Sequence, residues 1–197
     1  MATMPAREAA EKLPTDRLCL RRWIPADRAP FAALNGDPRV MEYFPGVLSR
    51  AQSDALASRI EAHFAAHGFG LWAVEIRNVT PFAGFIGLSV PRFTARFTPC
   101  VEMGWRLAAD YWGFGYASEG ARAVMDFGFG VLGLDEVVSF TTAANIRSRR
   151  VMEKLGMLHD PADDFDHPNL LDDDRLRRHV LYRQARPTPD GQERRNS

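Results

Sequence analysis

Hydrophobic and polar residues alternate along several short segments of the chain, and alternation with a period of two is typical of half-buried β-strands. In the segment 101–107 every odd-numbered residue is apolar, whereas Glu102, Gly104 and Arg106 occupy the other parity. This segment is therefore predicted to be a strand with one buried face. Similar short apolar runs predict further strands over 17–23, 70–76, 82–90, 137–142, a short stretch near 157, and 179–183.

Other segments carry apolar residues every three or four positions, the spacing of an amphipathic helix. Ser49 is a favourable N-cap for a helix over 50–67, and Gly68 is placed to end it. Further helices are predicted from Pro25 to about Leu34, over 117–132, and over 146–155 with Gly156 as the stop. The intervening segment 35–46 contains two prolines and two glycines, which favours a broken helical connection.

This order of elements predicts one domain, over 15–186, with helices interposed among the strands of a mixed α/β sheet. No internal repeat and no long linker divides the chain, and 197 residues suffice to bury a substantial core. Residues 1–14 are expected to form a flexible lead-in. The polar segment 187–197, which contains proline and glycine, is expected to be disordered.

Composition and charge narrow the function. The 25 basic and 25 acidic residues cancel, and no basic run is visible, which argues against non-specific nucleic-acid binding as the main activity. The first residues lack the apolar run of a signal peptide, and no segment approaches the ~20 apolar residues of a membrane span. We therefore expect a cytoplasmic protein without a membrane segment.

Candidate metal ligands are sparse. Cys19 and Cys100 are isolated, so we expect two small buried side chains rather than a disulfide or a metal framework. His63 and His67 have the spacing of two ligands on one helix face, but no third ligand is evident. The acidic segment 163–168 has a metal-like composition. We interpret it as a structural or substrate-facing loop whose carboxylates could attract a cationic amine, and we expect no metal cofactor.

The strand at 101–107 leads through Gly113 and Gly115 into the predicted helix at 117–132, and a strand, a glycine turn and a helix together favour an anion site. Ser118 stands where a dinucleotide fingerprint would have its third glycine, and no Gly-Lys-Ser/Thr follows. The turn is therefore neither a Rossmann nor a Walker motif. On this stretch alone, a helix that simply begins after a glycine turn explains the pattern equally well.

A second stretch, "NIRSRRVMEKLGM" over 145–157, follows the strand at 137–142. The two stretches together resemble the GNAT superfamily of N-acetyltransferases. The segments "TDRLCLRRW", "GLWAVEIR", "GFIGLSV", "DFDHP" and "LRRHVLYR" are similar to its RimJ/RimL-like branch, so that the resemblance covers roughly 15–183. It implies a GNAT fold, which is an α/β (α+β) fold with a single, mostly antiparallel sheet flanked by helices.

The resemblance also implies an activity, the transfer of an acetyl group from acetyl-CoA to a primary amine by direct attack on the thioester. The acceptor would be a protein N-terminus or a small molecule such as a polyamine or an antibiotic. The helical hairpin between 25 and 67 would line the acceptor side of the cleft. A homodimer would be consistent with the resemblance.

Candidate site residues follow from the family motifs. Glu102 would be the general base, directly or through water, and the hydroxyl of Ser148 would stabilise the departing thiolate. Asn145 would cap the helix at 146–155 and contact the cofactor arm. The residues expected to bind the cofactor are Leu107, Gly113, Phe114, Gly115, Tyr116, Ala117, Asn145 and Ser148.

The chain departs from the family pattern at three positions. Asp110 replaces a Gln or Arg before the first glycine, Phe114 replaces a residue that is often basic, and Met152 replaces a tyrosine that many members carry. These departures keep a second interpretation open, a non-catalytic acyl-CoA-binding or regulatory domain. Arginines that could compensate in binding the cofactor are Arg106, Arg147, Arg149 and Arg150.

Overall fold

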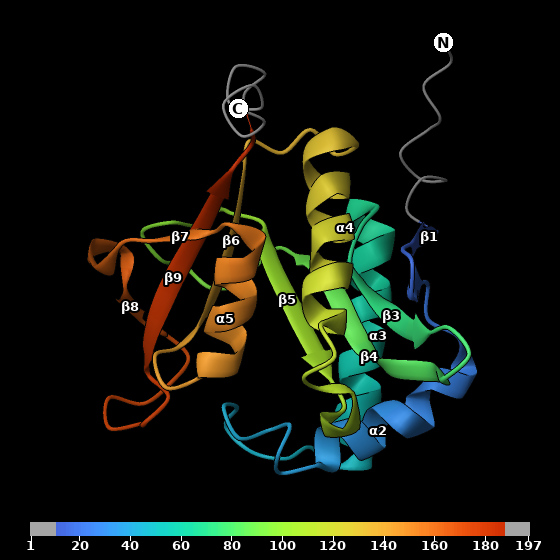
Figure 1. The fold of residues 1–197 in the computed structure, drawn as a ribbon. Helices are drawn as coiled ribbons and strands as arrows, with labels where there is room; N and C mark the ends of the chain where they lie inside the picture. The colour runs from blue at the N-terminus through green and yellow to red at the C-terminus, as the bar shows by residue number, and fades with distance from the viewer. Residues whose placement is uncertain (1–10, 188–197) are drawn as a thin grey trace.

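The computed structural model describes residues 11–187 (Figure 1). In chain order its elements are β1 (Lys12–Pro14), β2 (Leu18–Arg21), η1 (Pro25–Asp27), α2 (Arg28–Gly36), α3 (Arg50–His67), β3 (Leu71–Ile76), β4 (Thr80–Ser89), β5 (Glu102–Leu107), η2 (Ala109–Tyr111), α4 (Tyr116–Gly130), β6 (Glu136–Thr142), α5 (Ile146–Leu155), β7 (Leu158–His159), η3 (Pro161–Asp163), β8 (Phe165–Asp166) and β9 (Arg178–Ala185).

The strands form a single mixed sheet in the order β1-β2-β3-β4-β5-β6-β9-β7, with β8 also paired to β9. Every pairing is antiparallel except that of β5 with β6, which is parallel. Figure 1 shows α4 in front of the sheet and α3 behind it. The mixed, mostly antiparallel sheet flanked by helices confirms the predicted fold class.

Helix boundaries follow the local signals in the sequence. The Ser49 hydroxyl accepts from the Gln52 amide at 3.3 Å, and Gln52 Oε1 accepts from the Ser49 amide at 2.8 Å, so α3 begins with a capping box. Gly68 ends α3 in the left-handed conformation, with φ 76°. Gly156 ends α5 in the same way. These starts and stops are confirmed, whereas α2 begins after a 3-10 turn rather than directly at Pro25.

The ordered domain begins earlier than predicted. Lys12, Leu13 and Pro14 pair with Arg21, Leu20 and Cys19 of β2 to form an edge strand, so assigning these residues to a flexible lead-in was wrong. Leu13 also packs against the core, which explains why this short strand is held. Residues 1–10 and most of the predicted disordered tail lie outside the described residues.

One large core joins both faces of the sheet to the helices, and it includes fully buried Trp72, Ile86 and Val124. A smaller cluster lies at the β6-β9 end and is built mainly from aromatic rings. Its members are Val138, Phe165 and Leu181, with Phe93, Phe97, Cys100 and Phe140 packed against them. This second cluster places β8 and the acidic segment against β9.

The histidine and cysteine side chains considered as metal ligands, all in the described part of the chain, are not gathered into a metal site. The ring of His63 lies between two backbone groups, since Nδ1 is 2.9 Å from the Phe69 carbonyl oxygen and Nε2 accepts from the Val90 amide at 3.1 Å. Cys19 and Cys100 are free and half-buried, so they are less enclosed than expected. Within residues 11–187 no cluster of three or more His, Cys, Asp or Glu side chains is arranged to hold a metal. In the same range, no helix combines the length and apolar character that crossing a membrane requires.

Candidate active site

The parallel strands β5 and β6 separate almost as soon as they meet. They pair only at Glu102 and Val138, where the Val138 amide donates to the Val101 carbonyl at 3.0 Å. One residue further along β6, the Ser139 hydroxyl donates to the Met103 carbonyl at 2.9 Å. A side-chain hydrogen bond thus takes the place of the next backbone hydrogen bond between the two strands. Beyond this point the two strands diverge, and a cavity of about 770 Å³ opens between them. This volume suits a small-molecule ligand.

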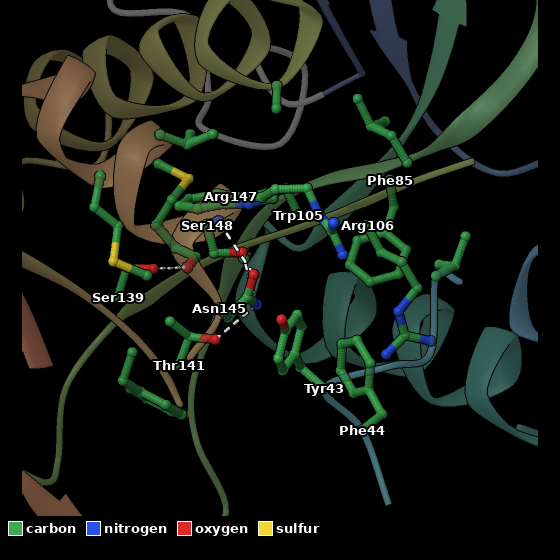
Figure 2. A pocket seen from close by; sticks show the side chains of 18 of the residues that line it. Tyr43, Phe44, Phe85, Trp105, Arg106, Ser139, Thr141, Asn145, Arg147 and Ser148 are labelled. Atoms are coloured by element: carbon green, nitrogen blue, oxygen red, sulfur yellow. Dashed lines mark hydrogen bonds between the residues drawn. The ribbon is translucent and has the colours of Figure 1, made fainter. Parts of the chain in front are cut away.

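Two groups of side chains face each other across the cavity. Figure 2 shows Thr141 of β6, the α5 N-cap Asn145 and Ser148 of α5 on one side, and Tyr43, Phe44 and Arg106 on the other. The glycine turn before α4 lines the same cavity through Gly113, Gly115 and the first residues of the helix. The cavity therefore combines the predicted anion site with the predicted catalytic strand.

Glu102 lines this cavity at the point where β5 and β6 diverge. Burial raises the pKa of its carboxyl to about 7, and the Ser89 hydroxyl, which donates to Oε2 at 3.4 Å, opposes that rise only weakly. A carboxylate that titrates near neutral pH and faces a cavity is suited to general base catalysis.

The glycine turn has the conformation of an anion-binding loop. Gly113 and Gly115 both adopt φ +83°, a left-handed conformation that side chains with a Cβ rarely take. A Cβ built on Gly113 would meet no protein atom within 4 Å, so open space lies above the turn. α4 begins at Gly115 without a side-chain cap, whereas α3 and α5 both have one. The first amides of α4 are thus left for a ligand.

The members of the turn play unequal parts. Tyr116 and Ala117 line the cavity, but the Phe114 side chain does not and is 61% exposed. The Phe114 carbonyl instead accepts from Arg17 Nη1 at 3.0 Å. Leu107 lines the cavity at the end of β5, and its carbonyl accepts from Trp112 Nε1 at 2.8 Å. Only the backbone of Phe114 is therefore available to contribute to the turn.

Contacts of Thr15 and Arg17 with Glu119 and with the turn hold the turn in place, and the sequence reasoning missed them. Arg17 Nε donates to Glu119 at 2.6 Å, and the Thr15 hydroxyl donates to the same carboxylate at 2.6 Å. The Arg17 guanidinium also lies 4.8 Å from the centre of the Tyr116 ring. Glu119 lies in the first turn of α4, where acidic residues are favoured, and this position is the one sequence signal that could have indicated these contacts.

Asn145 and Ser148 form a small polar network. Asn145 Oδ1 accepts from the Ser148 amide at 3.2 Å, which confirms Asn145 as the cap of α5. Its Nδ2 donates to Thr141 Oγ1 at 2.9 Å and to Ser148 Oγ at 3.1 Å. Because the Ser148 hydroxyl oxygen is already an acceptor, its own proton is left to donate toward the cavity.

The four candidate arginines are placed differently. Arg149 donates to Tyr182 and to the Ala143 carbonyl and does not line the cavity. Arg147 donates to Glu42 at 2.6 Å, and its guanidinium lies 4.5 Å from the centre of the Trp112 ring.

Arg150 and Lys154 lie one turn apart on α5 and line the cavity, and their side chains pair with no other group between residues 11 and 187. These two are the cations best placed to meet a bound phosphate, and the sequence reasoning missed Lys154. Arg106 is enclosed on the opposite wall.

The carboxylates of the acidic segment 163–168 do not line the cavity. Asp164 lies 2.7 Å from His159 Nε2, Asp166 pairs with Arg177 and Arg178, and neither carboxylate lines the cavity. Of this segment, only His167 lines the cavity, so the structural interpretation holds and attraction of a cationic amine by these carboxylates is not supported.

Comparisons with known proteins identify relatives. The model of the acetyltransferase (GNAT) domain family matches residues 17–158. An uncharacterised protein of Bacillus subtilis, YkkB, is 35% identical over 150 residues, which are 76% of this chain and 86% of YkkB.

Two solved structures share the fold. An acetyltransferase from Agrobacterium tumefaciens is 25% identical, with a TM-score of 0.70 over 93% of this chain and 96% of that one. The RimL ribosomal-protein alpha-N-acetyltransferase, solved in complex with coenzyme A, is 15% identical, with a TM-score of 0.71 over 89% and 98% of the two chains.

Proposed function

The chain belongs to the GNAT acetyltransferase family, and on this premise we propose that it transfers the acetyl group of acetyl-CoA to a primary amine. The observation that carries the proposal is the shared cavity, in which Glu102 and the uncapped glycine turn of α4 face one ligand-sized space. Acetyl-CoA would bring the activated thioester, and the residues of the chain would hold it and move the protons.

Binding is assigned to backbone and basic groups. The amides of Tyr116 and Ala117, at the positive end of the α4 dipole, would hold the pyrophosphate. Arg150 and Lys154 on α5 would add charge. Asp110, which departs from the family motif, points away from this role because it lies 3.6 Å from Arg39 and is largely exposed.

Proton transfer is assigned to Glu102 and Ser148. Glu102 would accept the proton of the amine, directly or through water, as the amine nitrogen bonds to the acetyl carbon. Ser148 would donate a hydrogen bond to the sulfur as the carbon–sulfur bond breaks, and the sulfur leaves protonated as free coenzyme A. The family tyrosine is not available, since Met152 is 1% exposed and belongs to the core.

Direct attack fits the cysteines better than a covalent intermediate does. Burial, with a smaller contribution from nearby Glu102, raises the pKa of the Cys100 thiol to about 11. At neutral pH this thiol is therefore protonated and a poor nucleophile. Neither Cys19 nor Cys100 lines the cavity.

We infer that the acceptor is of the kind used by the RimJ/RimL-like branch, either the N-terminal amine of a protein or the amine of a small molecule. The quoted sequence segments support this branch, and the fold shared with RimL is compatible with it. An α-amine with a pKa near ~8 is partly neutral at pH 7 and needs less help from a base than a lysine-like amine near ~10.4.

The test is release of free thiol from acetyl-CoA in the presence of different amines. The panel would contain short peptides with Ala, Ser or Met N-termini, polyamines, aminoglycosides and amino acids. Thiol release with one class is the expected result. Binding of acetyl-CoA by calorimetry without thiol release from any class would favour the non-catalytic acyl-CoA-binding domain, and absence of binding would contradict both.

Replacing Gly113 by valine is expected to weaken acetyl-CoA binding by about tenfold or more. A branched Cβ would enter the space above the turn and would also disfavour φ +83°, a conformation that costs an L-residue roughly 1–2 kcal/mol. Calorimetric titration with acetyl-CoA measures the change.

Gly68→Val is the matched control for this prediction. Gly68 has φ +76° and no protein atom within 4 Å of a built Cβ, but it ends α3 outside the cavity lining. The control should lose comparable stability and keep its affinity for acetyl-CoA. Equal affinities for the wild type and Gly113→Val would remove the turn from the site.

A further inference from the structure

Arg106 is a charged residue in the cavity wall that the proposed acetyl transfer does not use. Its Nε is shielded from solvent and has no hydrogen-bond partner, and it forms no ion pair within the described residues. Nη1 donates to Asn35 Oδ1 at 2.5 Å, and the guanidinium carbon lies 4.0 Å from the centre of the Phe44 ring. Burial lowers the pKa of Arg106 to about 10, so the side chain is still a cation at neutral pH.

A partly buried cation without a counter-ion is costly, and no acidic side chain of the described residues pairs with Arg106. The neighbour that receives its hydrogen bond, Asn35, is a neutral amide held in turn by Ser53 Oγ at 2.9 Å. Glu102 is the acid on the same face of β5, but its Cα lies four strand rises, or about 13 Å, from that of Arg106. The nearby Glu42 is already paired with Arg147. The missing negative charge is thus one that a ligand in the cavity could bring.

The face of β5 that lines the cavity also has room for a ligand that carries this negative charge. Glu102 and Arg106 share one parity of β5, and Gly104 lies between them without a side chain. A Cβ on Gly104 would have only Leu71 Cδ2 nearby, at 3.9 Å, so the floor between the two charges is open. Arg106 Nη2 makes no hydrogen bond within the described residues and, unlike Nε, is not shielded from solvent, so it is the donor that a carboxylate in the cavity would meet.

We propose that Arg106 binds a carboxylate of the acetyl acceptor, and that the acceptor is therefore a small amino acid-like molecule. This inference rests on the proposed function. The amine would lie toward Glu102 and the carboxylate toward Arg106, along the face of β5 that Gly104 leaves open. Asn35 is a positioning residue that holds the guanidinium, and Phe44 covers it.

The first experiment measures binding without turnover. N-acetylated glycine, β-alanine, γ-aminobutyrate and ε-aminocaproate, and the carboxamide of each, would be titrated into the protein by calorimetry. The wild type should bind the acid at least about tenfold more tightly than its amide at the best chain length, because the charge-assisted contact with Arg106 is lost in the amide. In parallel, kcat/KM would be measured for the corresponding free amines with acetyl-CoA.

Two variants test the residue. Arg106→Gln should bring the acid-to-amide ratio to about one. Asn35→Asp should do the same while keeping the fold, because it places a carboxylate beside Nη1 and the Ser53 hydroxyl can donate to that carboxylate. The control Arg28→Gln removes an exposed pair with Glu61 outside the cavity and should keep the full preference.

The outcomes separate this proposal from the proposed function. Equal binding of acids and amides by the wild type, or no binding of any acid, overturns the carboxylate subsite even if the free amines are acetylated. A preference that survives in both variants also overturns it, because the anion is then held elsewhere. Tighter binding of phosphonate analogues would replace the carboxylate with a phosphate. Acid-selective binding that both variants abolish, without any acetyl transfer, supports the subsite and contradicts the proposed function.

Discussion

Replacing Glu102 by glutamine is expected to lower kcat/KM for acetyl transfer by about 10²–10⁴-fold, the range that general base catalysis contributes. Glutamine keeps the shape and the contact with Ser89 but cannot accept the proton of the amine. The loss should be larger for lysine-like amines than for α-amines, because fewer of the former are neutral at pH 7. Steady-state rates with one acceptor of each kind measure it, and acetyl-CoA affinity should stay within about twofold.

The pH dependence gives the same prediction an independent check. With a Glu102 pKa of about 7, the base is protonated and inactive below that value, so wild-type kcat/KM should rise as the pH increases through about 7. The variant should keep only the dependence that comes from the amine itself. A wild-type profile without this rise, or a variant that retains it, would assign the base to another group.

Stability supplies the control for folding. The folded pKa of Glu102 is raised above its ordinary value, so the folded state binds the proton more tightly than the unfolded state between about pH 4.5 and 7. Stability therefore falls as the pH rises through this window, and the cost persists above it. Glu102→Gln removes the buried charge and should unfold at a higher temperature than the wild type at pH 8, but not at pH 4. An inactive variant that is less stable at pH 8 would indicate a structural role.

Replacing Gly84 by alanine is expected to destabilise the fold by about 4 kcal/mol or more, a large part of the roughly 5–15 kcal/mol by which a typical domain is stable. Gly84 lies in the middle of β4 with φ +138°, a conformation that L-residues rarely adopt. A Cβ there would lie 2.1 Å from the Arg106 carbonyl oxygen on β5, and backbone cannot move aside as a side chain can. Thermal or urea unfolding measures the effect.

Gly104→Ala is the matched control, since it adds the same methyl group to the neighbouring strand. Its Cβ would have only Leu71 Cδ2 within 4 Å, at an ordinary van der Waals distance of 3.9 Å, and its backbone is not left-handed. We expect a change in unfolding free energy below about 1 kcal/mol. Similar losses for the two variants would mean that β4 and β5 are not as closely apposed as the structure has them.

The sequence predicted what local physics determines. Ser49, Gly68, Asn145 and Gly156 mark helix ends because capping depends on residues within one turn. The alternation at β5 also revealed its buried face, since Met103 and Leu107 are both nearly inaccessible to solvent. The strand, the glycine turn and α4 were accordingly placed to within one or two residues.

What the sequence could not predict depends on partners far away along the chain. The Arg17–Glu119 pair joins residues 102 positions apart, and the Arg106–Asn35 bond joins residues 71 apart. No local pattern says which of several arginines will find a carboxylate and which will be left without one. β1 was missed because three residues with a terminal proline carry too short a pattern, although pairing with β2 holds them.

The single parallel pairing at Glu102 and Val138 has a mechanical consequence. It makes the sheet two panels, β1 to β5 and β6 to β9, that share a seam only one ladder pair long beside the Ser139 bond. An extended ligand with amide groups could lie in that seam as a surrogate strand and bridge the panels. Ligand binding would then also join the two panels of the sheet. Without a ligand, β5 and β6 would be linked only by the Glu102–Val138 pairing and the Ser139 hydrogen bond.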